Sequence, residues 1–248
     1  MSVQAKRRAD YQPPAFSIAT VDLHITLHPT ETKVVSTLAI ARNGAHNAPL
    51  VLDGDGLELN AIAVNGEALS EEFYTLGDNT LSINSELDTF ELVITTTIAP
   101  EHNKALEGLY LSGGAYCTQC EAEGFRRITY FMDRPDVLSV YTVTVVADKS
   151  IPMLLANGNP VDKGDIDASS HFVKWHDPHP KPCYLFALVA GDFDLLTDSY
   201  TTSSGKEVAL ELYVDKGKKS QGGFALESLK RAMKWDEDIF GLEYDLDI

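Results

Sequence analysis

The chain has 248 residues, of which 44% are apolar and 23% are charged, and its formal net charge is −17. These proportions are typical of a soluble globular protein and exclude disorder as the main state. The negative charge is spread along the sequence, so no cluster of Lys and Arg is available to bind phosphate groups. We therefore expect neither nucleic acid nor a membrane as a partner, and a cationic ligand suits this charge better.

The sequence also predicts the cellular compartment. No apolar run approaches the roughly 20 residues that a membrane helix needs, and the basic first eight residues are not followed by an apolar stretch. Cys117, Cys120 and Cys183 are the only cysteines, and an odd number does not suggest the disulfide framework of a small secreted protein. We expect a cytoplasmic protein.

A pattern of alternating apolar and polar residues begins at Phe16. Val21, Leu23, Ile25 and Leu27 alternate with polar residues, which is the period of a strand with one buried face. Similar segments cover residues 38–41, 57–64, 90–98 and 137–146. Two of them end at Asn-Gly pairs, which favour tight turns. The pattern predicts a largely antiparallel β-sandwich or a curved sheet.

The pattern changes in the last part of the chain. A strand predicted over residues 208–214 is followed by apolar residues at helical spacing between positions 225 and 240, and Gly241 stands where a helix typically ends. Tyr244, Leu246 and Ile248 then begin a new alternation. We therefore expect residues 1–190 to form one β-rich domain, and residues 191–248 to be the truncated start of a second domain.

Residues that could bind a metal are scattered. Of the seven histidines only His176 and His179 form a local pair, and the prolines beside them exclude the helix on which a zinc-binding pair would lie. Cys117 and Cys120 have the C-x-x-C spacing, but two further zinc ligands are missing nearby, so we expect two half-buried thiols. Neither a G-x-S-x-G motif nor a glycine-rich phosphate loop is present. The motifs predict no catalytic residue and no metal site in this chain.

A segment at residues 118–136, between two β-rich regions, contains the most suggestive polar group. If the backbone is extended, Glu121 and Glu123 share one face beside the amide of Gln119. Such a group could bind an ammonium ion, because a carboxylate in a partly desolvated pocket attracts a cation far more strongly than one in water. The spacing by itself favours the other interpretation, in which Glu121 or Glu123 forms an ion pair with an arginine at position 126, 127 or 134 and fixes the loop.

Several irregular segments occur in an order that matches a known family. They are residues 118–125 (TQCEAEGF), 133–136 (DRPD), 157–159 (NGN), 181–193, 208–214 and 233–237. With these segments the sequence resembles the N-terminal part of the proteobacterial aminopeptidase N family of gluzincin zinc metalloaminopeptidases. The resemblance extends over essentially the whole chain.

The resemblance implies a mainly β fold, with an antiparallel β-rich saddle or sandwich domain followed by the truncated start of a thermolysin-like α+β catalytic domain, made of strands and one helix. It also implies that Gln119 and Glu121 bind the α-ammonium group of a peptide substrate. The G-A-M-E-N and H-E-x-x-H motifs of the family would lie beyond Ile248. We therefore expect zinc, the general base and the transition-state Tyr in the full-length enzyme, and none of them in this chain.

Two function hypotheses follow from these observations. In the first, the chain is part of a zinc aminopeptidase that hydrolyses N-terminal residues from peptides, and its partners are peptide substrates, held by their N-terminal amine, and the missing catalytic domain of the same chain. Glu123 is then assigned to fixing the loop with an arginine, and the fragment is inactive. In the alternative, the chain is a non-catalytic β-sandwich interaction module whose Glu-rich loop binds a basic partner surface.

Overall fold

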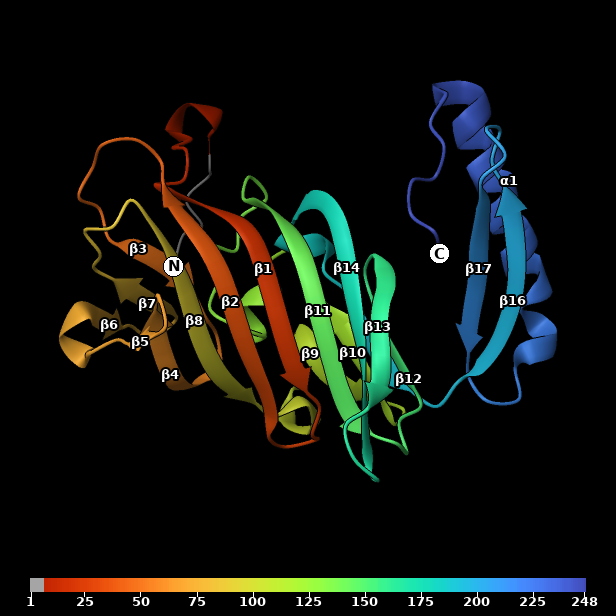
Figure 1. Cartoon of the computed structure of the whole chain (residues 1–248), viewed down its shortest axis with the longest axis horizontal. Coiled ribbons are helices and arrows are strands. Elements are labelled where there is room, and N and C mark those ends of the chain that lie inside the picture. Colours follow the sequence, from red (N-terminus) through yellow and green to blue (C-terminus); the bar gives the residue numbers. More distant parts are fainter. Residues whose placement is uncertain (1–6) are drawn as a thin grey trace.

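The computed structural model describes residues 7–248 (Figure 1); residues 1–6, which include most of the basic start noted above, lie outside the described residues. The strands are β1 (Phe16–Thr26), β2 (Thr32–Arg42), β3 (Leu50–Asp53), β4 (Glu58–Val64), β5 (Glu67–Ala68), β6 (Tyr74–Leu76), β7 (Thr80–Ile83), β8 (Thr89–Ile98), β9 (Gly108–Ser112), β10 (Ala115–Gln119), β11 (Leu138–Asp148), β12 (Met153–Ala156), β13 (Asn159–Asp165), β14 (Ser170–Pro182), β15 (Leu188–Gly191), β16 (Asp194–Thr201) and β17 (Glu207–Val214). The helix is α1 (Gly223–Phe240), and the 3-10 turns are η1 (Arg8–Asp10), η2 (Glu71–Phe73), η3 (Pro100–His102), η4 (Phe125–Arg127), η5 (Cys183–Leu185) and η6 (Lys219–Gln221).

The strands form four sheets. The largest has eight strands in the order β13-β14-β11-β1-β2-β8-β4-β5, and its members lie side by side across the molecule (Figure 1). A four-stranded sheet has the order β12-β15-β10-β9, a three-stranded sheet has the order β3-β7-β6, and β16 pairs with β17. Neighbouring strands are antiparallel except for β1 and β11, which are parallel. The prediction of a mainly β, largely antiparallel fold is confirmed.

One hydrophobic core is shared by the three larger sheets. In β1 the side chains of Val21, Leu23 and Ile25 are at most 1% exposed, while the residues between them are exposed, as the alternation predicts. The same core cluster includes Leu50 of the three-stranded sheet and Ala190 of the four-stranded sheet. Because the eight-stranded sheet buries one face in this cluster, both smaller sheets pack against that face.

The other predicted strands are also present. The predicted segments fall within or nearly coincide with β2, β4, β8, β11 and β17. Asn65 and Gly66 both have positive φ, at 51° and 82°, and form the tight turn between β4 and β5. This pair of left-handed residues is the reason that an Asn-Gly sequence marks a hairpin.

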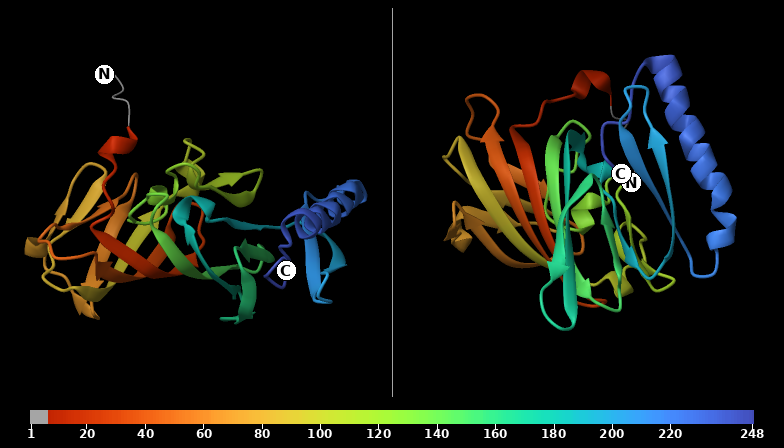
Figure 2. Two further views of the ribbon diagram at one scale, coloured as in Figure 1. Left: turned by 90° about the horizontal axis from the view of Figure 1, so that it is seen from above. Right: turned by 45° about the vertical axis from the view of Figure 1, so that its right-hand side comes forward.

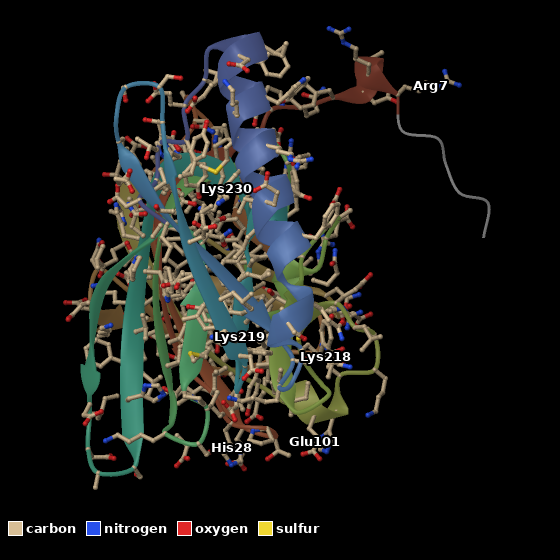
Figure 3. The ribbon with its side chains drawn as sticks, turned by 90° about the vertical axis from the view of Figure 1, so that its right-hand side faces the viewer. Arg7, His28, Glu101, Lys218, Lys219 and Lys230 are labelled. Atoms are coloured by element: carbon tan, nitrogen blue, oxygen red, sulfur yellow. The ribbon has the colours of Figure 1, made fainter. Side chains whose placement is uncertain are left out.

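The first turn of the eight-stranded sheet, at His28, lies at the same end of the molecule as Glu101 of η3 (Figure 3). The N–H of Glu101 donates to the carbonyl of Pro29.

The last part of the chain contains a hairpin and the helix. The helix α1 lies along one face of the β16–β17 hairpin (Figure 2) and ends at Gly241, which has a φ of 67° and donates its N–H to the carbonyl of Glu237. The strand suggested by the alternation after residue 243 is absent: residues 244–248 form no strand. Ala209 of β17 donates to the carbonyl of Asp247, but the N–H of Asp247 donates to the side chain of Asn159, so no ladder develops.

A second, small hydrophobic cluster holds this part together. Its buried residues are Val208, Leu210 and Leu226, and Lys230 of α1 (Figure 3) forms an ion pair of 2.5 Å with Asp198 of β16. The helix buries one residue and exposes several large apolar side chains, among them Phe224, Trp235, Ile239 and Phe240. Within residues 7–248, no helix combines the length and the apolar character needed to cross a membrane.

Candidate functional site

Gln119 is the last residue of β10, and the neighbouring strands hold this end of β10 in place. Gln119 pairs with Gly108 of β9. On the other side, the Thr118 hydroxyl donates to the carbonyl of Leu188 at 3.0 Å and accepts a hydrogen bond from the Leu188 N–H at 2.8 Å. The position of Gln119 is therefore set by β9 and β15 together.

The chain turns sharply after Gln119 into a segment that we call the acidic loop, residues 119–127. The Gly124 N–H donates to the carbonyl of Cys120 at 2.8 Å and closes the turn, and the peptide bond between Glu121 and Ala122 is cis. Gly124 is required here because a Cβ atom at this position would lie 2.4 Å from the carbonyl oxygen of Gln119. The Gln119 side chain donates to the carbonyl of Glu121 at 2.9 Å. The structure thus brings Gln119 and Glu121 together on the surface, where both are exposed.

The arginines of this region form ion pairs with acidic residues other than Glu121. Arg126 lies 3.4 Å from the carboxylate of Glu123, which is the loop-fixing pair predicted for Glu123. Arg127 lies 2.6 Å from Asp55, and the third arginine, at position 134, pairs with an aspartate at position 136. Among the described residues, Glu121 is therefore left exposed and without an arginine partner.

An aromatic cluster supports the acidic loop from below. Phe125 of η4 is 0% exposed, and its ring contacts three other rings edge to face. The ring centroids lie 5.0 Å away for Phe131, 5.2 Å for Phe186 and 6.2 Å for Tyr141. These partners come from three different segments, so Phe125 fixes the loop to the common core.

Beside Phe125, Arg126 meets two aspartates that the sequence did not predict as its partners. The Arg126 guanidinium contacts Asp133 at 2.9 Å and Asp53 at 3.8 Å. Burial raises the pKa of Asp53, and the positive charge of Arg126 opposes that rise. Burial alone would lower the pKa of Arg126, but the hydrogen bond to Asp133 and the nearby carboxylates raise it. Asp53 and Asp133 are 80 positions apart, so no local spacing pointed to them.

The C-x-x-C pair does not form a reactive site. All three cysteines are free; Cys117 is half-buried as predicted, whereas Cys120, which starts the turn of the acidic loop, is only 2% exposed. Burial, assisted by the charge of Asp133, raises the pKa of Cys120 to about 12, and burial also raises the pKa of Cys183. A thiol with such a pKa is a poor nucleophile and metal ligand at neutral pH.

The two histidines that are close in sequence, at positions 176 and 179, contact different residues. His176 and His179 lie in β14; the first contacts the Thr142 hydroxyl at 3.0 Å and the second lies 3.1 Å from Asp245. Across residues 7–248, no three His, Cys, Asp or Glu side chains are grouped in a way that could hold a metal ion.

We accordingly expect that this chain alone binds less than stoichiometric zinc. The physical reason is that a tight zinc site needs at least three protein ligands with supporting hydrogen bonds, and the histidines here have separate partners. Elemental analysis of extensively desalted protein measures the content. One equivalent of zinc that survives dialysis against a weak chelator would contradict this prediction.

Four hollows in the described part of the surface have linings that include neither Gln119 nor Glu121. One of them, of about 800 Å³, is lined by residues including Arg42, His46 and Phe73. The Arg42 guanidinium donates to the carbonyl of His46 at 3.0 Å, so it already serves to hold the surrounding loops together. Gln119 and Glu121 are both exposed, and neither lines any of these four hollows.

Residues 12–185 match the peptidase M1 N-terminal domain, and the chain belongs to that family. The chain is 55% identical to aminopeptidase N of Caulobacter vibrioides over 245 residues, which cover 99% of this chain and 28% of that protein. It thus spans just over a quarter of the length of this relative.

Solved structures show the same fold. The chain superposes on Legionella pneumophila aminopeptidase A in complex with aspartic acid with a TM-score of 0.91 and 36% identity, over 98% of this chain and 29% of that one. It also superposes on an M1 zinc metallopeptidase of Deinococcus radiodurans, bound to a Tyr-Ser-Ala substrate, with a TM-score of 0.78 and 19% identity, over 94% and 55% of the two chains. The second likeness concerns the fold alone.

Proposed function

We propose that this chain is the N-terminal part of a zinc aminopeptidase and that Gln119 and Glu121 bind the α-ammonium group of its peptide substrates. The observation that carries the proposal is Glu121 itself: its carboxylate is exposed on a loop held by β10 and by Phe125, and no arginine of the described chain neutralises it. The Gln119 side chain lies beside it and donates to its backbone carbonyl. The aminopeptidase N relative matches across this loop.

An anchor for the ammonium group acts mainly by positioning the substrate. An ammonium group held by Glu121 and by the amide oxygen of Gln119 places the first peptide bond of the substrate, and no later one, at the reacting centre. A carboxylate that is open to water attracts a cation only weakly. The site therefore needs a second surface that excludes water from Glu121, and we assign this surface to the part of the full-length protein that this chain does not contain.

Zinc belongs to that other part. The described residues supply no ligand set for it, and when bound in the full-length enzyme it would polarise the scissile carbonyl and activate water. The role of this chain is to bind and orient the amine. We assign residues 1–190 to one domain and residues 191–248 to the start of the next, since the two hydrophobic clusters separate between Ala190 and Leu196.

We further propose that the enzyme acts in the cytoplasm, in peptide catabolism. The three free thiols, two of them buried, support a reducing compartment. The alternative of a non-catalytic interaction module loses support, because the family match and the aminopeptidase N relative both span the acidic loop.

The test compares two substrates of the full-length enzyme, an alanyl peptide with a free N-terminus and the same peptide with an acetylated N-terminus. Acetylation removes the positive charge and leaves the site carboxylate unpaired, so we expect kcat/KM to fall by at least about a hundredfold. Mass spectrometry of the products shows which bond is cleaved. Equal cleavage of the two peptides, or cleavage at internal bonds, would exclude an amine-anchored exopeptidase.

A further inference from the structure

Asp133 lies beneath the acidic loop, and its carboxylate is almost completely buried, with 1% of the side chain exposed. One carboxylate oxygen accepts hydrogen bonds from the backbone N–H of Arg126 at 3.1 Å and from its Nε at 2.9 Å. The other oxygen accepts a hydrogen bond from the thiol of Cys183 at 3.1 Å. A buried carboxylate is tolerated only where such donors surround it. These donors come from the end of the acidic loop and from η5.

The backbone of Asp133 adds a third connection. Its N–H donates to the carboxylate of Asp53 at 3.2 Å, and its carbonyl accepts a hydrogen bond from the Arg126 guanidinium at 3.2 Å. Asp53 ends β3 and exchanges two backbone hydrogen bonds with Phe131, at 2.7 and 3.0 Å. Asp133 therefore joins the acidic loop to β3 and to η5.

This arrangement determines how the acidic loop is held. At its first residue the loop is continuous with β10, which is paired on both sides. At its other end, Arg126 is bound through both its backbone and its side chain to the single carboxylate of Asp133. Glu121 lies between these two points. Without the second point, residues 120–126 would keep the Phe125 ring, the Gly124 turn, the hydrogen bond from the Asp55 N–H to the Arg126 carbonyl at 3.0 Å and the longer contact of Arg126 with Asp53 at 3.8 Å, but Arg126 would lose its shortest side-chain contact.

We propose that Asp133 is a positioning residue for the amine-binding site, which holds the acidic loop through Arg126 so that Glu121 and Gln119 face the substrate ammonium group. This inference rests on the proposed function of Gln119 and Glu121. It assigns to Asp133 no contact with the substrate. Because a displacement of about 1 Å in an anchoring group can reduce a rate a hundredfold, a residue two steps removed from the substrate can control turnover.

The test is a double-mutant cycle in the full-length enzyme. Asp133→Asn keeps the size of the side chain and one acceptor oxygen, but it loses the charge-assisted bonds to Arg126. We expect it to lower kcat/KM for a free-amine peptide by about tenfold or more, with changes in both kcat and KM. On a Glu121→Gln background, where the anchor is already lost, the same substitution should change kcat/KM by less than about threefold.

Asp136→Asn is the matched control. Asp136 is also an aspartate paired with an arginine, at 2.7 Å from Arg134, but its hydrogen bonds go to Arg134 and Tyr11 rather than to the acidic loop. It should change kcat/KM by less than about threefold in either background. Melting temperatures of all variants separate loss of positioning from loss of fold.

Three outcomes decide the matter. Equal losses from Asp133→Asn with and without Glu121 would show that Asp133 acts independently of the anchor, and the inference would be overturned. A Glu121→Gln variant with unchanged kcat/KM would overturn the proposed function itself and this inference with it. If Asp133→Asn fails to fold, Arg126→Lys is taken through the same cycle, since it keeps the charge but loses the Nε bond to Asp133. Additive effects there would equally refute the positioning role.

Discussion

Replacing Glu121 by Gln in the full-length enzyme is expected to lower kcat/KM for free-amine peptides by about thirty- to a thousandfold. A carboxylate that faces an ammonium group in a water-excluded site is worth on the order of 2–4 kcal/mol when one partner is lost. Both kcat and KM should change, because the anchor sets the position of the scissile bond as well as the affinity. Steady-state kinetics measure the effect.

Two further variants calibrate this result. Gln119→Ala removes a neutral hydrogen-bonding group near the same amine and should cost roughly 1–2 kcal/mol. Glu123→Gln is the matched control, because Glu123 is a glutamate in the same loop but pairs with Arg126, at 3.4 Å on an exposed surface. It should leave kcat/KM nearly unchanged. If Glu121→Gln stays within about threefold of wild type and lowers the melting temperature instead, Glu121 is a structural residue and not an anchor.

Phe125→Ala is expected to have the largest effect on stability, about 3–5 kcal/mol of the free energy of unfolding. The ring is 0% exposed and lies against the rings of Phe131, Tyr141 and Phe186, so its removal leaves a cavity in the core. Urea denaturation followed by tryptophan fluorescence measures the loss. Trp175, which is 7% exposed, reports on the β-rich part, whereas Trp235 on α1 is 54% exposed.

Phe73→Ala is the control for this substitution. Phe73 is the same residue type in the same β-rich part, but it is 48% exposed, so truncation should cost about 1 kcal/mol or less. Similar losses for the two variants would mean that the aromatic cluster beneath the acidic loop does not carry the stability assigned to it.

The local elements could be predicted well because their signals are local. In β1 the alternation of Val21, Leu23 and Ile25 with polar residues matched the buried and exposed faces of the strand. The helical spacing before Gly241 matched α1 in the same way. Where the signal was short the prediction was wrong: three alternating apolar residues after position 243 form no strand, because Asn159 takes the N–H of Asp247.

The candidate site was predictable only in part. The residue types and the order of the acidic loop were in the sequence, and they were enough for the resemblance that pointed to Gln119 and Glu121. From spacing alone, however, Glu121 and Glu123 were equivalent candidates for an arginine partner. The structure separates them, since Arg126 lies 3.4 Å from Glu123 and Glu121 is left exposed.

By itself, the sequence determined which segments form strands, where the helix ends and which loop concentrates the acidic groups, because each depends on residues within about ten positions of one another. Only the tertiary structure decided that β1 pairs in parallel with β11, and that Arg126 meets Asp53 and Asp133 beneath the loop. These contacts join segments that are up to about a hundred and twenty positions apart along the chain. They form because burying one face of the large sheet brings the smaller sheets together. A carboxylate such as that of Asp133 is stable in the buried space between them only where hydrogen-bond donors from several segments surround it.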